Sequence, residues 1–162
     1  MKYVAGLLAL CTMSAFAQVP ISGTVESKCV ITTDTDGVYG NPTPSKLSTG
    51  AADGGVTPIV RFDVVSADYY KARITYPNDF SSSPELLDTV NWSGAVTVGE
   101  VSNAEMAAYE TAKVEFNNTV EFDLTLAGST WFKIDSEADY GYDKAFPAGT
   151  YNAVVEAECI AK

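Results

Sequence analysis

Short stretches in which apolar and polar residues alternate recur along this chain, and Pro, Gly, Asn or Asp residues end them. The clearest stretch covers residues 69–76 and is stopped by the Pro-Asn-Asp of residues 77–79. Alternation with a period of two puts successive side chains on opposite faces of a strand, whereas an amphipathic helix needs a period near 3.6. The pattern therefore restricts most of the chain to half-buried β-strands.

The same pattern predicts the order of elements along the chain. We expect strands over residues 21–31, 56–65, 69–76, 90–98, 114–116, 119–126, 130–135 and 150–160. Residues 34–55 are rich in Asp, Gly, Pro, Thr and Ser, which predicts a long ordered loop or a short edge strand. Ser102 and Glu105 form a capping box that predicts a short helix to about Lys113, with Met106 and Tyr109 on one face. Seven or eight short strands with one short helix predict an all-β fold, an antiparallel β-sandwich.

Length and composition indicate one folded domain. The chain has 162 residues, which suits one well-filled domain and is short for two. It is 46% hydrophobic and 19% charged, so it has enough apolar surface to bury and should fold. No internal repeat or long linker divides it, and we expect residues 18–162 to form a single β-sandwich domain.

The first 17 residues have the features of a cleaved secretory signal peptide. Lys2 is followed by an apolar run from Tyr3 to Cys11, and the segment ends in Ala15-Phe16-Ala17. The run is too short to span a bilayer permanently, and no later segment approaches 18 consecutive apolar residues. We therefore expect export to the periplasm, the cell surface or the extracellular medium, and no membrane insertion.

Two cysteines, Cys29 and Cys159, remain once Cys11 has left with the signal peptide. Two cysteines in an oxidising compartment usually pair, and the alternative, a redox pair, generally needs CxxC spacing. The bond would close a loop of 159 − 29 = 130 residues, for which the chain-entropy model gives at most about 5 kcal/mol. A disulfide between the first and last strands favours a complete, self-contained sandwich.

The charge balance and the absence of His exclude several classes of function. Ten Lys and Arg residues against 21 Asp and Glu give a net charge of −11, which predicts no nucleic acid partner because phosphate contacts need clustered cations. The chain has no His, so Ser/His and Cys/His nucleophile pairs and His-ligated metals are excluded. Paired carboxylates remain, but no motif selects a pair from so many. The sequence predicts a protein that is not an enzyme.

Two weaker patterns suggest ligand sites and an alternative function. Asp34 and Asp36, followed by Gly37, could supply oxygen ligands to calcium, although they make only half of an EF-hand loop and also suit an Asx turn. Tyr140 and Tyr142 lie in a loop pattern and could present exposed rings to a sugar. The alternative function is therefore a secreted carbohydrate- or calcium-binding module, with calcium as the one cofactor considered.

Two segments carry a resemblance to a known family. The approach to the last strand, Phe146-Pro147-Ala148-Gly149-Thr150-Tyr151, and the opening residues 21–25 with the strand that finishes at Cys29, resemble the last and first strands of chaperone-usher pilins and related fimbrial or spore-coat-like domains. Those domains are incomplete immunoglobulin-like sandwiches, completed by an extended segment from a neighbouring subunit.

The resemblance implies an antiparallel immunoglobulin-like β-sandwich that serves as a structural or adhesive surface subunit, fimbrial-like and involved in cell adhesion. The implied partners are other subunits, held by edge-strand pairing, or a periplasmic chaperone. Only residues 18–20 precede the strand expected over 21–31, so we expect no N-terminal donor segment with alternating apolar residues.

Overall fold

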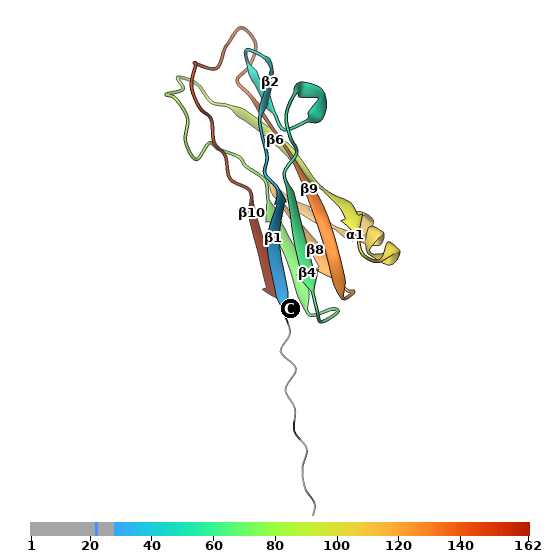
Figure 1. Cartoon of the computed structure of the whole chain (residues 1–162). Helices are drawn as coiled ribbons and strands as arrows, with labels where there is room; N and C mark the ends of the chain where they lie inside the picture. Colours follow the sequence, from blue (N-terminus) through green and yellow to red (C-terminus); the bar gives the residue numbers. More distant parts are fainter. Residues whose placement is uncertain (1–21, 23–27) are drawn as a thin grey trace, which may run out of the picture.

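The protein is built from two antiparallel β-sheets and one short helical segment (Figure 1). A computed structural model describes Ser22 and residues 28–162 of the chain. The first sheet contains β1 (Cys29–Thr35), β2 (Gly40–Thr43), β3 (Lys46–Ser48), β4 (Ile59–Val64), β6 (Asn91–Val101) and β9 (Gly128–Asp139). The second contains β5 (Tyr70–Thr75), β7 (Val114–Phe116), β8 (Thr119–Leu124) and β10 (Glu156–Ala161). The expected all-β sandwich is confirmed.

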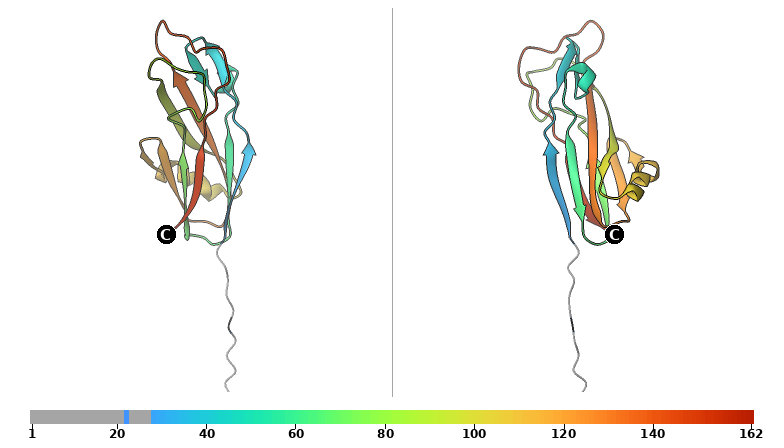
Figure 2. Two further views of the ribbon diagram at one scale, coloured as in Figure 1. Left: turned by 90° about the vertical axis from the view of Figure 1, so that its left-hand side faces the viewer. Right: turned by 45° about the vertical axis from the view of Figure 1, so that its right-hand side comes forward.

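The long strand β9 organises the first sheet. Along one edge it pairs with β4 and, farther on, with β3, while its other edge pairs with β6. Strand β1 pairs with β4, and β2 pairs with β3. The second sheet has the order β10-β5-β8-β7. Strands β1 and β10 therefore lie at the edges of different sheets, and they run side by side in Figure 1. Figure 2 (left) turns this side of the sandwich toward the viewer.

Alternation along the strands builds the core between the sheets. Phe62 of β4, Phe122 of β8 and Phe132 of β9 are almost fully buried. The Phe132 ring meets Phe62 at a centroid distance of 5.5 Å and Phe122 at 4.4 Å, so these rings join the two sheets. Ile74 and Ile134, also fully buried, belong to the same cluster.

The short helical segment links β6 to β7. It consists of the 3-10 turn η2 (Ala104–Ala108) and α1 (Tyr109–Ala112), as expected near this position. Met106 and Tyr109 are buried, as their spacing predicts. Within the described residues, no helix is long and apolar enough to cross a membrane.

The helix cap is Asn103, one residue after the expected Ser102. The Asn103 side chain accepts a hydrogen bond from the Glu105 N–H at 3.0 Å. The backbone of Ser102 still continues the ladder between β6 and β9 by donating to the Ser129 carbonyl, and its hydroxyl accepts from the Ser129 N–H. Because Ser102 is held by its neighbouring strand, the next residue begins the helix.

Several strand boundaries differ from the expected ones. The strand expected over 21–31 has residues 21 and 23–27 outside the described residues, and the observed β1 begins only at Cys29. Residues 34–55 contain the paired strands β2 and β3 and the 3-10 turn η1 (Ala51–Asp53). In the stretch expected as a strand over 150–160, the ladder begins at Glu156, because β5, its neighbour, ends at Thr75.

We predict that Phe132→Ala lowers the free energy of unfolding by about 3–5 kcal/mol, because it removes the ring that joins both sheets and leaves a cavity. Urea unfolding followed by fluorescence measures the change. Lys133→Ala on the same strand, where the side chain is exposed, is the control and should cost less than about 0.5 kcal/mol. Equal losses in both variants would contradict this account of the core.

Candidate functional site

The described disulfide joins the two sheets at one end of the sandwich. Cys29 of β1 is bonded to Cys159 of β10, with a Cα–Cα distance of 6.3 Å, which confirms the predicted pair. Strand β1 pairs with β4 and β10 pairs with β5, and in the described part of the chain their facing edges pair with no strand. The disulfide therefore connects two open sheet edges.

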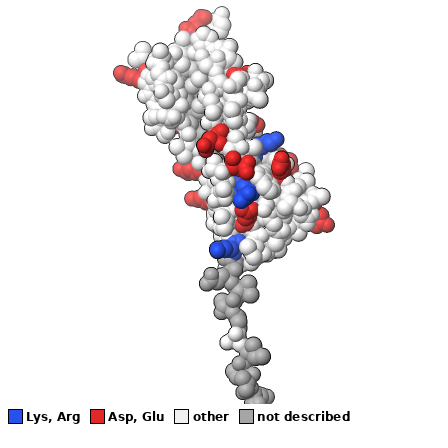
Figure 3. All heavy atoms as spheres, in the orientation of Figure 1, with Lys and Arg blue, Asp and Glu red and all other residues white. Residues whose placement is uncertain are grey.

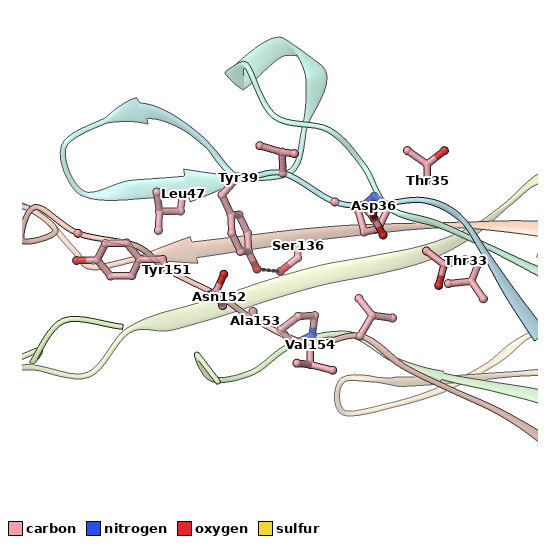
Figure 4. Close-up of a pocket in the computed structure, with 17 residues that line it drawn as sticks. Thr33, Thr35, Asp36, Tyr39, Leu47, Ser136, Tyr151, Asn152, Ala153 and Val154 are labelled. Atoms are coloured by element: carbon pink, nitrogen blue, oxygen red, sulfur yellow. Dashed lines mark hydrogen bonds between the residues drawn. The ribbon is translucent and has the colours of Figure 1, made fainter. Parts of the chain in front are cut away.

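A groove of about 590 Å³ opens between these edges, beyond the disulfide (Figure 4). One wall comes from residues 33–39, at the end of β1 and just after it, and the other from residues 149–155. Leu47, Val60 and Ser136 lie among the residues between the walls. Among the described residues, the disulfide thus closes only part of this side of the sandwich.

The interior of the groove is largely uncharged. The Tyr39 hydroxyl lies 2.9 Å from the Ser136 hydroxyl. A dashed line marks this hydrogen bond in Figure 4. Burial raises the pKa of Tyr39, and the hydrogen bond to Ser136 only partly opposes this rise, so the phenol stays neutral. Among the described residues that line the groove, Asp36 is the one carboxylate. The groove therefore has no pair of carboxyl groups for acid–base catalysis.

The groove walls offer backbone groups and apolar side chains to a ligand. Residues 149–155 run along the groove outside any ladder, and within this stretch Asn152 alone forms a bridge, to Ser82. Val38 and Val154 line the groove and are 53% and 58% exposed. Open backbone edges with exposed apolar neighbours are the usual template for pairing with another extended chain.

On the opposite side of the sandwich, side chains of the helical segment cover part of the β6 edge. Val98 of β6 donates its N–H to the Glu110 carboxylate at 2.7 Å, and the Lys113 ammonium donates to the Val96 carbonyl at 3.0 Å. Glu110 and Lys113 also form an ion pair at 2.8 Å. Figure 1 shows α1 on the side away from β10. These contacts occupy backbone groups that a foreign strand would need at the β6 edge.

The contacts of Glu110 lower its pKa. Burial by itself would raise that pKa, but hydrogen bonds from Lys113 and from the Val98 N–H, with the charge of Lys113, together outweigh burial. For Lys113, burial would lower the pKa, and the bonds to Glu110 and Glu115 raise it instead. The charged forms of both side chains are therefore the forms that hold the β6 edge.

We predict that Glu110→Gln removes a pH-dependent part of the stability. Because the folded pKa of Glu110 lies below its ordinary value of 4.5, its contribution is present above about pH 4.5 and is lost as pH falls through the folded pKa. Since the side chain is partly exposed, we expect a loss of roughly 0.5–1 kcal/mol at neutral pH. Urea unfolding at pH 7 and at pH 3 measures it.

Glu105→Gln is the matched control for this measurement, because Glu105 is exposed and belongs to the same helical segment. The control should unfold like the unmodified protein at both pH values. If Glu110→Gln also behaved like the unmodified protein at pH 7, the carboxylate would not stabilise the β6 edge.

The structure separates the two aspartates of the calcium hypothesis. Both are exposed, and Asp34 accepts a hydrogen bond from the Trp131 indole N–H at 3.2 Å, whereas Asp36 lines the groove. No group of three or more His, Cys, Asp or Glu side chains suited to a metal occurs among the described residues. Asp34 and Asp36 therefore have no further acidic ligand beside them.

We predict that millimolar calcium leaves the melting temperature unchanged within about 1 °C. A site filled at 100 times its Kd would add about 2.7 kcal/mol and raise the melting temperature by several degrees. Differential scanning fluorimetry with calcium or with excess chelator makes the comparison. A calcium-dependent rise that Asp36→Asn abolishes would establish an ion site at these aspartates.

The two tyrosines of the sugar hypothesis lie in different environments. Tyr142 is 93% exposed, but Tyr140 is only 6% exposed, so the expectation that both rings are exposed is wrong. Tyr140 follows the buried positions Ser136 and Ala138 in the alternation of β9, and its ring stacks on Phe146 at 5.1 Å. Its hydroxyl accepts hydrogen bonds from two backbone N–H groups of the neighbouring loop. A paired stacking surface is therefore not formed.

Six aromatic rings pack together at the loop end of the sandwich, beside the groove. Their centroid distances lie between 4.7 and 6.5 Å, and the rings are those of Tyr39, Phe80, Trp92, Tyr140, Phe146 and Tyr151. Tyr39 and Tyr151 also line the groove, on opposite walls. The cluster therefore fixes the two walls of the groove near the ends that lie farthest from the disulfide.

The sequence pattern does not predict this groove. It singles out Asp36, but only as a metal ligand. Tyr39 and Ser136 are 97 positions apart, and no local pattern connects them. The usable signal was the alternation in residues 150–155, for which the described part of the chain supplies no neighbouring strand ladder.

Comparison with known proteins identifies no relative. No family model matches the chain, and neither a curated protein nor a solved structure matches it.

Proposed function

We propose that the chain is an exported, non-enzymatic structural subunit of a surface fibre, which assembles by capturing an extended strand from a second subunit. The observation that carries this proposal is the pair of open edges that flank the groove, β1 with its continuation and residues 149–155. The contacts at the β6 edge agree with it, because side chains there occupy backbone groups that a foreign strand would need.

An extended strand in the groove would satisfy the backbone groups of both walls. Neighbouring strands lie about 4.8 Å apart, so one added strand can bond to a wall on each side and link the two sheets. Alternate side chains of that strand would point toward Leu47 and Val60, which are buried. Main-chain hydrogen bonds would supply affinity, and these apolar positions would supply specificity.

The segment before β1 is the donor that we propose. The described part of the first strand begins at Cys29, so residues 18–28 lie before it. From residue 19 to residue 25, every second residue is apolar, except for one glycine, and the residues between them are polar or Pro. The apolar residues are Val19, Ile21 and Val25, and the glycine is Gly23. In this proposal, residues 18–28 of one copy enter the groove of the next, and a periplasmic chaperone could occupy the same groove before assembly.

The resemblance to chaperone-usher pilins supports the same function. Its motif begins the wall of residues 149–155, where Gly149 and Tyr151 line the groove. An incomplete immunoglobulin-like sandwich, a location in the periplasm or at the cell surface, and an adhesive role through the fibre belong to this proposal.

The test uses paired substitutions on the two faces of the donor segment. We expect Ile21→Asn with Val25→Asn to abolish multimers of the mature protein, because polar side chains would then point at the apolar floor of the groove. The amount of multimer should fall by more than about tenfold. It is measured by light scattering on the purified mature chain and by electron microscopy of cell-surface material.

Ser22→Asn with Thr24→Asn is the matched control, since these residues have the opposite parity and the change is equally polar. It should assemble like the unmodified protein. A mature protein that stays monomeric, forms no complex with a chaperone and never occurs in surface fibres would contradict the proposed function.

A further inference from the structure

We infer that the Cys29–Cys159 disulfide is a stop that sets the register of the captured strand. The inference rests on the proposed function, since it concerns where the incoming strand ends. Its first support is the separation of the two edges: the Cα atoms of the two cysteines are 6.3 Å apart. A strand lying between two others needs about 9.6 Å between them, which is twice the usual spacing. No strand fits between β1 and β10 at the disulfide.

The position of the groove agrees with the conclusion that no strand fits between β1 and β10 at the disulfide. Strand β1 leaves the disulfide and β10 runs toward it, so the two strands have opposite directions (Figure 1). Counting away from the disulfide, the first groove residues are Thr33, four positions after Cys29, and Val155, four positions before Cys159. Both walls begin at the same distance from the disulfide, which is what a single closure between them would produce.

The length of the open section matches the length of the donor pattern. The wall from Thr33 to Tyr39 spans seven residues, which is about 23 Å of extended chain. The donor pattern from Val19 to Val25 also spans seven residues. A donor of this length fills the groove when one end abuts the closed section.

The alternating pattern alone cannot select this register. A shift of one residue would turn the apolar side chains of the donor away from the floor, but a shift of two residues returns the same parity to it. The donor pattern repeats every two residues, at Val19, Ile21, Gly23 and Val25. A donor strand shifted by two residues therefore keeps most of its apolar contacts. A physical barrier at one end of the groove removes the registers that extend past it.

The experiment maps where a bound peptide protects the groove. The mature chain carrying Ile21→Asn and Val25→Asn supplies an unoccupied groove, and a synthetic peptide of residues 18–28 is the ligand. Hydrogen exchange with mass spectrometry compares this oxidised protein with the same chain carrying Cys29→Ser and Cys159→Ser. We expect added protection of about tenfold in residues 33–39 and 149–155 of the oxidised protein, and in the serine variant an extension into 30–32 and 156–158.

Ile74→Ala, in the core with the disulfide intact, controls for lost stability and should keep the oxidised pattern. Protection that reaches residues 30–32 in the oxidised protein overturns the stop, even if the serine variant fails to fold. Identical protection limits in the oxidised protein and a folded serine variant overturn it as well. Both results leave strand capture intact, whereas no protection anywhere in the groove rejects the proposed function and the stop with it.

Discussion

Backbone N–H and C=O groups at the edge of a β-sheet need hydrogen-bond partners, and a sandwich of two open sheets has four such edges. In this protein the edges of β6 and β7 are joined through the helical segment, and those of β1 and β10 through the disulfide. In the first pair, side chains of the helical segment bond directly to the β6 edge, while the second pair is tied at one end and open beyond it. Whether the backbone groups of an edge are covered or left open decides where another chain can bind.

The two closures act by different physical means. Met106 and Tyr109 anchor the helical segment in the core, which places Glu110 and Lys113 beside the β6 backbone. Cys29 and Cys159 instead hold two edges together without giving either a backbone partner. A covered edge resists strand pairing, whereas a tied edge remains a template for it. In the proposed assembly, the next copy would therefore bind at the tied edges and not at the covered β6 edge.

Local alternation predicted the parts of this fold that depend on neighbours in sequence. Val60, Phe62 and Val64 point inward as their spacing indicates, and the helical segment lies near its expected position. The cap at Asn103 and the burial of Tyr140 were missed, because a cross-strand bond and an extension of β9 determine them. The groove was missed for a stronger reason: it depends on the fact that no described strand lies beside the facing edges of β1 and residues 149–155, and no local pattern records a missing neighbour.

The charge of the chain bears on how such subunits could associate. A net charge of −11 makes copies repel one another, and Figure 3 shows acidic side chains spread over the visible face with the basic ones set among them. Several cations are already engaged, since Lys71 and Arg73 pair with Glu121 on the second sheet. Attraction between unlike charges therefore cannot supply most of the affinity. Backbone hydrogen bonds and apolar contacts in a groove with one carboxylate, Asp36, act at short range and are little weakened by that repulsion. This is why the open edges, and not the charged faces, are where a second copy would be held.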